Sequence, residues 1–273
     1  MTAARQLARV VVWMIGTLIS FSVMAVSIRE LWGALTIMEI LTVRAAIGLA
    51  IVAAAAAARP DLRSTIVRRR LGLHLARNSI HFASQYLWAM SLVLLPLATV
   101  FALEFTMPAW TALLAVWFLH ERMTPSRLGV VVLGLIGVLV ILRPGIASFN
   151  PAAIFVLLAA FGYAITMIAT KKLTMTETTF GIVFWMAVIQ FPLSLIGSDP
   201  AAFLHFEARH FLPAIGVGAA GLTGTAVALA LGIPALKIKG PFLAVTSLAL
   251  VFVATWTWSG GRRLTAFSAT RTV

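Results

Sequence analysis

Long apolar runs separated by short polar segments set the pattern of this chain. A run of about 18 or more apolar residues is long enough to cross roughly 30 Å of hydrocarbon as a helix. The pattern predicts spans at 10–28, 34–57, 73–95, 97–119, 127–142, 152–170, 178–196, 211–234 and 241–258. We therefore expect an all-α polytopic membrane protein with about nine transmembrane helices.

The composition supports a membrane protein. Hydrophobic residues make up 61% of the 273 positions and charged residues 11%, and the mean hydropathy is +1.02. Soluble domains carry charge on about a quarter of their residues. The chain has no cysteine, which excludes disulfides, thiolate metal sites and cysteine nucleophiles.

The net charge of +13 is a topology signal, because the basic residues stand in short loops between apolar runs. The side shared with the N-terminus would hold Arg5, Arg9, Arg59, Arg63, Arg68, Arg69, Arg70, Arg122, Arg127, Lys171, Lys172, Lys237 and Lys239. The other side would hold Arg29, Arg143 and Arg209, with Arg262, Arg263 and Arg271 in the tail. This bias predicts a cytoplasmic N-terminus and a lipid bilayer partner, not nucleic acid.

Two segments of the chain are weakly similar. GTLISFSVMAVSIREL (16–31) aligns with LAAFGYAITMIATKKL (158–173). Five predicted spans precede the second copy, so the two copies would cross the membrane in opposite directions. Inverted repeats of this kind are a recurrent plan of secondary transporters, with the binding site between the halves.

One stretch resembles a known family. LWAMSLVLLPLATVFALEFTMPAWTALLAVWFLHERMTPSRLGVVVLGLIGVLVILRPG (87–145) is similar to the third to fifth helices of the drug/metabolite transporter superfamily, EamA type. The likeness rests on the SLVLLPLA turn, the helix with Pro108, the His120-Glu121-Arg122 end, the close at Arg143-Pro144-Gly145, and Glu39 and Arg44 in MEILTVRAAIGL. Members close to this pattern include riboflavin and S-adenosylmethionine uptake carriers.

The resemblance implies ten helices in two inverted five-helix repeats in the bacterial inner membrane. The central cavity would be lined by spans one, three, four, six, eight and nine. Residues 1–145 would form the first EamA-type repeat, 146–258 a second repeat of about four helices, and 259–273 an atypical tail. After Pro241 the pattern offers no tenth span, so the second repeat is expected to be incomplete.

A polar stripe interrupts the third span. His74, Asn78, His81 and Gln85 follow one another at spacings of four, three and four, with Arg77 beside them. These spacings place the side chains on one helix face. His74 and Arg77 either snorkel to the interface or face inward, and Asn78, His81 and Gln85 either bond neighbouring helices or line the solute path.

Glu104 lies inside the fourth span, four residues before Pro108. Proline removes a backbone donor and loosens the helix around the glutamate. A carboxyl group in an apolar site is a candidate for taking up and releasing a proton during transport. The alternative is an ion pair with Arg44 or Arg77.

Arg44 lies more than two turns inside the second span, and Glu39 points to a different side of that helix. Arg44 either holds an anionic group of a solute or ties helices together, and the frequency of structural arginines favours the tie. Trp88 and Tyr163 are candidates for stacking on a planar solute, although for most such aromatic side chains anchoring in the interfacial belt or lipid contact is favoured.

These features predict a carrier that moves a small organic metabolite or drug by alternating access, with Glu104 as the proton-coupling candidate. Enzyme signatures such as GxSxG and HExxH are absent, so neither catalysis nor a metal or other cofactor is expected. A channel is disfavoured because no carbonyl-filter segment is visible. The alternative is a truncated, non-transporting fragment of such a carrier, because a tenth span is missing.

Overall fold

The computed structural model describes residues 3–120, 122–142 and 150–235. Within these ranges the chain is helical, and a single bridge between Trp32 and Leu35 is the one β-type contact. The elements are α1 Ala3–Leu31, α2 Ile37–Ala58, α3 Pro60–Arg63, α4 Leu71–Leu94, α5 Leu97–Glu104, α6 Met107–Leu119, α7 Pro125–Leu142, α8 Ala152–Thr174, α9 Thr179–Leu195, the 3-10 helix η1 Pro200–His205 and α10 Ala208–Ala235.

Eight of the nine predicted spans coincide with these helices, the fourth being formed by α5 and α6 together. The ninth span at 241–258, the tail, Glu121 and Arg143-Pro144-Gly145 lie outside the described residues. By length and composition, three described segments are suited to cross a membrane: Ile37–Ala58, Leu97–Leu119 and Ala152–Thr174. The short helices α3 and η1 lie in predicted loops, where the hydrophobic pattern gave no signal.

Local chemistry explains several helix boundaries. The Thr36 side chain accepts from the Glu39 N–H, and the Glu39 carboxylate accepts from the Thr36 N–H at 2.7 Å, so α2 begins with a capping box. The fourth span breaks after Glu104 and restarts at Met107. Pro108 stands in the first turn of α6, where a missing N–H is tolerated.

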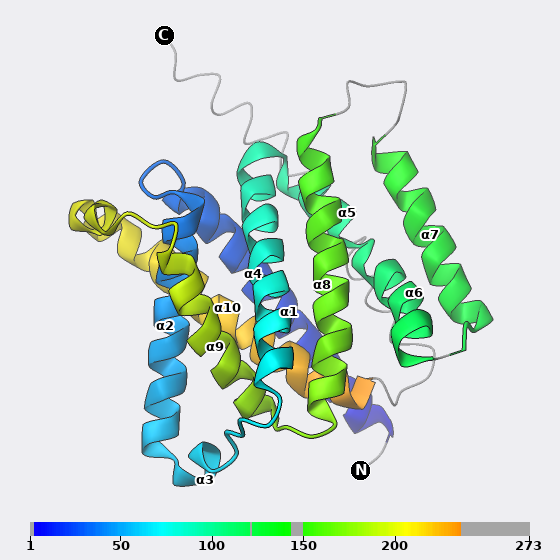
Figure 1. Cartoon of the computed structure of the whole chain (residues 1–273). Helices are drawn as coiled ribbons and strands as arrows, with labels where there is room; N and C mark the ends of the chain where they lie inside the picture. The colour runs from blue at the N-terminus through cyan, green and yellow to red at the C-terminus, as the bar shows by residue number, and fades with distance from the viewer. Residues whose placement is uncertain (1–2, 121, 143–149, 236–273) are drawn as a thin grey trace.

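Helices far apart in the sequence pair closely (Figure 1). α1 packs on α10, α4 on α8 and α2 on α9, and α10 also contacts α2 as α9 contacts α4. This set of five contacts is unchanged when α1, α2 and α4 are exchanged with α8, α9 and α10. α6 lies between α8 and α7 at one edge of the bundle.

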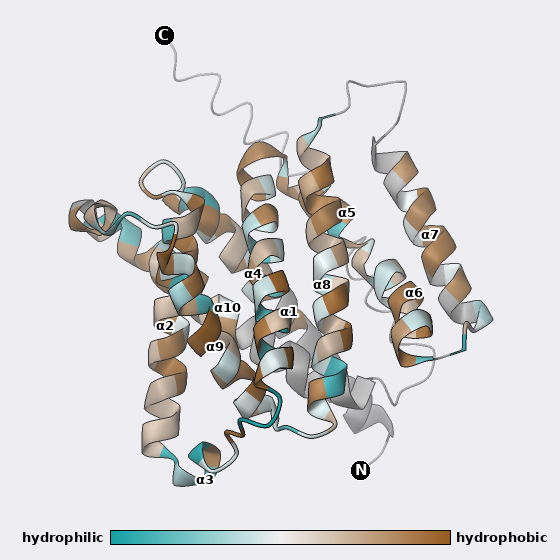
Figure 2. Ribbon diagram, in the orientation of Figure 1, coloured by the Kyte–Doolittle hydropathy of each residue, from teal (hydrophilic) through white to brown (hydrophobic). Residues whose placement is uncertain are grey.

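The largest buried cluster joins α1, α2, α4 and α5 to α8 and α10, and its almost fully buried members include Ile28, Leu31, Ile40, Leu92 and Leu103. At the edge, α7 exposes leucine and isoleucine side chains along much of its length. Figure 2 shows this apolar outer helix and the hydrophilic segment around α3 at one end of the bundle. An apolar exterior of this kind suits a lipid environment.

Candidate functional site

Three polar side chains meet in the middle of the bundle. The Nδ1 atom of His81 lies 2.9 Å from the amide nitrogen of Gln85 on α4 and 2.9 Å from that of Gln190 on α9. Both glutamines are buried. With both amides donating, Nδ1 accepts and the ring carries its proton on Nε2. His81 therefore links a helix of the first half of the chain to one of the second.

Tyr163 brings a third helix to this group. Its ring meets the His81 ring edge to face, with centroids 5.4 Å apart. Tyr163 belongs to α8, so the polar centre is built from α4, α8 and α9. An aromatic ring beside hydrogen-bonding groups suits an organic solute with both planar and polar parts.

Arg77 and Asn78 form a second buried contact on the same stripe. The Arg77 Nη1 donates to the Asn78 Oδ1 at 2.6 Å, and its Nε donates to the Thr170 hydroxyl of α8 at 3.2 Å. The Asn78 amide nitrogen is buried without a hydrogen-bond partner. This side of α4 is therefore hydrogen-bonded to α8, and the Asn78 NH2 group remains without an acceptor.

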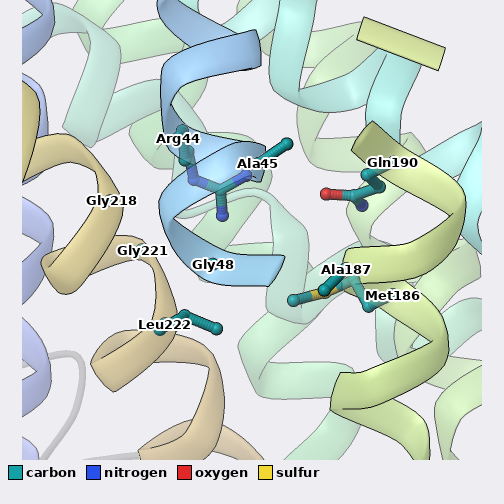
Figure 3. Close-up of a pocket in the computed structure, with 9 residues that line it drawn as sticks. All are labelled: Arg44, Ala45, Gly48, Met186, Ala187, Gln190, Gly218, Gly221 and Leu222. Carbon is teal, nitrogen blue, oxygen red and sulfur yellow. The ribbon is translucent and has the colours of Figure 1, made fainter. Parts of the chain in front are cut away.

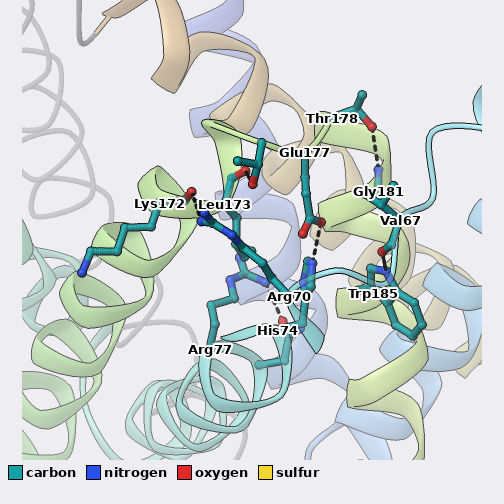
Figure 4. A network of polar contacts seen from close by, with 12 residues as sticks. Val67, Arg70, His74, Arg77, Lys172, Leu173, Glu177, Thr178, Gly181 and Trp185 are labelled. Atoms are coloured by element: carbon teal, nitrogen blue, oxygen red, sulfur yellow. Dashed lines mark hydrogen bonds and ion pairs between the residues drawn. The ribbon is translucent and has the colours of Figure 1, made fainter. Parts of the chain in front are cut away.

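His74 is the first residue of the polar stripe and lies in the first turn of α4 (Figure 4). Its Nε2 lies 2.6 Å from the Glu177 carboxylate in the α8–α9 turn, and both side chains are buried. Beside it Arg70 donates to the Lys172 carbonyl, and the Trp185 indole donates to the Val67 carbonyl at 2.8 Å. With His74 at 0% and Arg77 at 5% exposure, the snorkelling alternative is wrong for both. Packing against α8 and α9 turns these side chains inward.

Glu104, at the end of α5, faces Trp88 on the preceding helix α4. The indole Nε1 donates to its carboxylate at 2.8 Å. Among the described residues no guanidinium lies within ion-pair distance of Glu104, so the alternative pairing with Arg44 or Arg77 is wrong. α4 supplies an indole donor instead. Trp88 is 2% exposed, so its ring lies in the core and not in an interfacial belt.

Arg44 lines a small cavity of about 20 Å³ between α2, α9 and α10 (Figure 3). Its guanidinium and the Gln190 amide both extend into this space from different helices. The Arg44 Nε is buried without a hydrogen-bond partner. Glu39 binds elsewhere, at the start of α2. This cavity shares only α10 with the six spans that the family resemblance assigned to the solute path.

Gln190 is the residue that sequence reasoning missed. It stands alone in the apolar run IVFWMAVIQFPLSL, before Pro192. A single amide inside such a run is itself a signal, because burying it costs free energy unless it finds a partner. Within the described part of the chain, no three His, Asp or Glu side chains gather as a protein metal site requires.

Comparison with known proteins adds a family to this geometry. The model of the EamA-like transporter family matches residues 8–143. An S-adenosylmethionine uptake transporter of Rickettsia felis is 32% identical over 133 residues, 49% of this chain and 45% of that protein. A riboflavin transporter of Brucella anthropi is 34% identical over 123 residues, 45% of this chain and 43% of that protein. The chain thus spans about half the length of the curated relatives that it matches.

One solved crystal structure is similar in fold. It aligns with a TM-score of 0.54 and 15% sequence identity, and the alignment covers 94% of this chain and 99% of the other. At that identity the likeness concerns the arrangement of helices alone.

Proposed function

From the membership of residues 8–143 in the EamA-like transporter family, we propose that this chain carries a small organic solute across a membrane. The observation that carries the proposal is the meeting of α4, α8 and α9 side chains at His81. Buried polar groups in a membrane bundle are costly and commonly mark a solute path. His81, Asn78, Gln85 and Gln190 would bond the solute, and Trp88 and Tyr163 would contribute aromatic surface.

Alternating access is the proposed mechanism, with two inverted repeats rocking around this centre. The exchange symmetry of the helix contacts supports it, because α1, α2 and α4 pair with α10, α9 and α8 in the manner of two related halves. The buried His74–Glu177 contact would hold one end of the path closed in this conformation.

The proposed membrane is the bacterial inner membrane, with the N-terminus in the cytoplasm. The beginning of α1 and helix α3 lie toward the same end of the bundle (Figure 1). The basic segment from Arg59 to Arg70 contacts the Lys172 end of α8 there. A concentration of Lys and Arg at one end favours the cytoplasmic side.

Proton coupling through Glu104 is the proposed energy source. The carboxylate lies at the end of α5, within the apolar segment Leu97–Leu119, and Trp88 is its hydrogen-bond donor. Trp88 lies on α4, two turns after His81, so the donor to Glu104 and the polar centre share one helix face. A change in the charge of Glu104 would therefore be felt where the solute is proposed to bind.

Uptake into proteoliposomes tests the transport proposal. The full chain is reconstituted, and the uptake of radiolabelled S-adenosylmethionine and riboflavin is followed against protein-free liposomes. A carrier gives rates that saturate with concentration, whereas a channel gives rates that rise linearly. An absence of protein-dependent uptake across a wider solute panel would reject the proposal.

A further inference from the structure

We propose that Arg44 binds a carboxylate group of the solute, in the cavity that it shares with Gln190. This inference rests on the proposed transport function and names a substrate class for it. The three observations that carry it are a part-buried guanidinium with no carboxylate partner, its buried Nε atom with no hydrogen-bond partner, and a small-residue wall around it.

Two guanidinium groups lie inside the bundle without a carboxylate partner. Among the described residues neither Arg44 nor Arg77 has an acidic side chain within 4 Å. The acidic side chains inside the bundle are engaged elsewhere, Glu39 with Thr36, Glu104 with Trp88 and Glu177 with His74. A cation inside a membrane bundle costs free energy when no anion lies beside it, so an anionic group on the solute would supply the missing partner.

Arg44 is the better placed of the two arginines. Arg77 already donates to Asn78 and Thr170, whereas the Arg44 Nε donates to nothing. A guanidinium presents its donors as a planar fork that matches the two oxygens of a carboxylate. Gln190 lines the same cavity and also contacts His81, so it connects the arginine to the polar centre.

Glycines leave space around the Arg44 guanidinium. Gly48 of α2 and Gly218 and Gly221 of α10 line the cavity. A Cβ at Gly221 would lie 2.5 Å from the Arg44 Nε, so any side chain there would displace the guanidinium. The cavity of about 20 Å³ holds about one water molecule, so a carboxylate enters when α10 moves away from α2.

The proposal separates the solutes named for the two relatives. S-adenosylmethionine carries an α-carboxylate, whereas riboflavin has none. Decarboxylated S-adenosylmethionine lacks only this group, so it provides a matched probe. The proposed class is therefore a carboxylate-bearing metabolite, and not a neutral flavin.

Equilibrium binding to the full chain in lipid nanodiscs tests the assignment, with radiolabelled S-adenosylmethionine and its decarboxylated form as probes. The intact chain should bind the carboxylate form about 10- to 100-fold more tightly, as expected for a charge-assisted hydrogen bond. Arg44→Gln should bring the two dissociation constants within about twofold of each other. Arg44→Lys should keep an intermediate ratio, because it retains the charge and loses the fork.

The matched control is Arg59→Gln, which removes an exposed arginine paired with Asp61 at the surface and should leave the ratio unchanged. A ratio of dissociation constants does not depend on the fraction of protein that folds, so partial misfolding of a variant does not hide the result. Equal binding of both probes by the intact chain, or binding of neither, overturns the proposal.

Transport measured in parallel separates the two proposals. Saturable uptake with no preference for the carboxylate form overturns the Arg44 assignment and leaves the carrier function standing. Carboxylate-selective binding without any uptake supports the site and rejects transport. Persistence of the ratio in Arg44→Gln shows that another group holds the carboxylate, which overturns the assignment.

Discussion

The imidazole of His74 lies 2.6 Å from the carboxylate of Glu177, and the two side chains are 0% and 1% exposed. The contact joins α4 to the turn between α8 and α9, more than a hundred residues along the chain. It therefore ties the two halves of the chain together at one end of the bundle.

Removing one member of this pair should destabilise the fold. Glu177→Ala leaves the buried His74 Nε2 without its hydrogen-bond partner, and the free energy of unfolding in detergent should fall by about 1–3 kcal/mol. Glu177→Gln should lose less, because its amide oxygen still accepts a hydrogen bond. The control is Glu207→Ala, which breaks the exposed pair with Arg209 and should cost less than about 1 kcal/mol. Similar losses at the two positions would contradict this view.

A close approach of α8 to α4 gives a second test. A Cβ at Gly162 would collide with the Ser84 hydroxyl. Gly162→Ala should therefore lower thermal stability, by about 1–3 kcal/mol of unfolding free energy. The double variant with Ser84→Ala should recover most of the loss, because the hydroxyl is removed. Gly72→Ala is the control, since nothing lies within 4 Å of its added Cβ. Failure of Ser84→Ala to rescue would show that the close packing is not the cause.

His81 and Gln190 should act as a unit in solute binding. Each single substitution, His81→Ala or Gln190→Ala, should raise the KM for uptake, because each removes a member of the polar centre. If the 2.9 Å contact is functional, the double variant should lose less than the sum of the two single losses. The coupling free energy expected for residues in contact is about 0.5–3 kcal/mol. If the loss in the double variant equals the sum of the two single losses, His81 and Gln190 act independently and the prediction fails.

Glu104 should control the pH dependence of uptake. In Glu104→Gln the amide oxygen still accepts from Trp88, so membrane insertion and stability should be retained. The variant has no group to titrate at this position, so the uptake rate should no longer change with pH. Glu207→Gln, at an exposed loop position, should keep the pH profile of the intact chain. An unaltered profile in Glu104→Gln would rule out the coupling role.

Much of the fold was readable from the pattern of apolar runs, because a membrane-length helix satisfies its own backbone hydrogen bonds and needs little tertiary information. Eight predicted spans match helices, and the break beside Pro108 appears where the missing N–H weakens the ladder. The four-three-four spacing from His74 to Gln85 also placed those side chains on one face of α4.

The contact partners of these side chains could not be predicted from the sequence. His81 meets Gln190 across 109 positions, Glu104 meets Trp88 and not an arginine, and Arg44 faces α10 and not Glu39. The sequence by itself determined where helices form and which polar groups must be buried, since both follow from local periodicity and the cost of desolvation. Only the tertiary structure decided which buried polar side chains contact one another, because these contacts depend on how each helix is rotated and packed against distant neighbours.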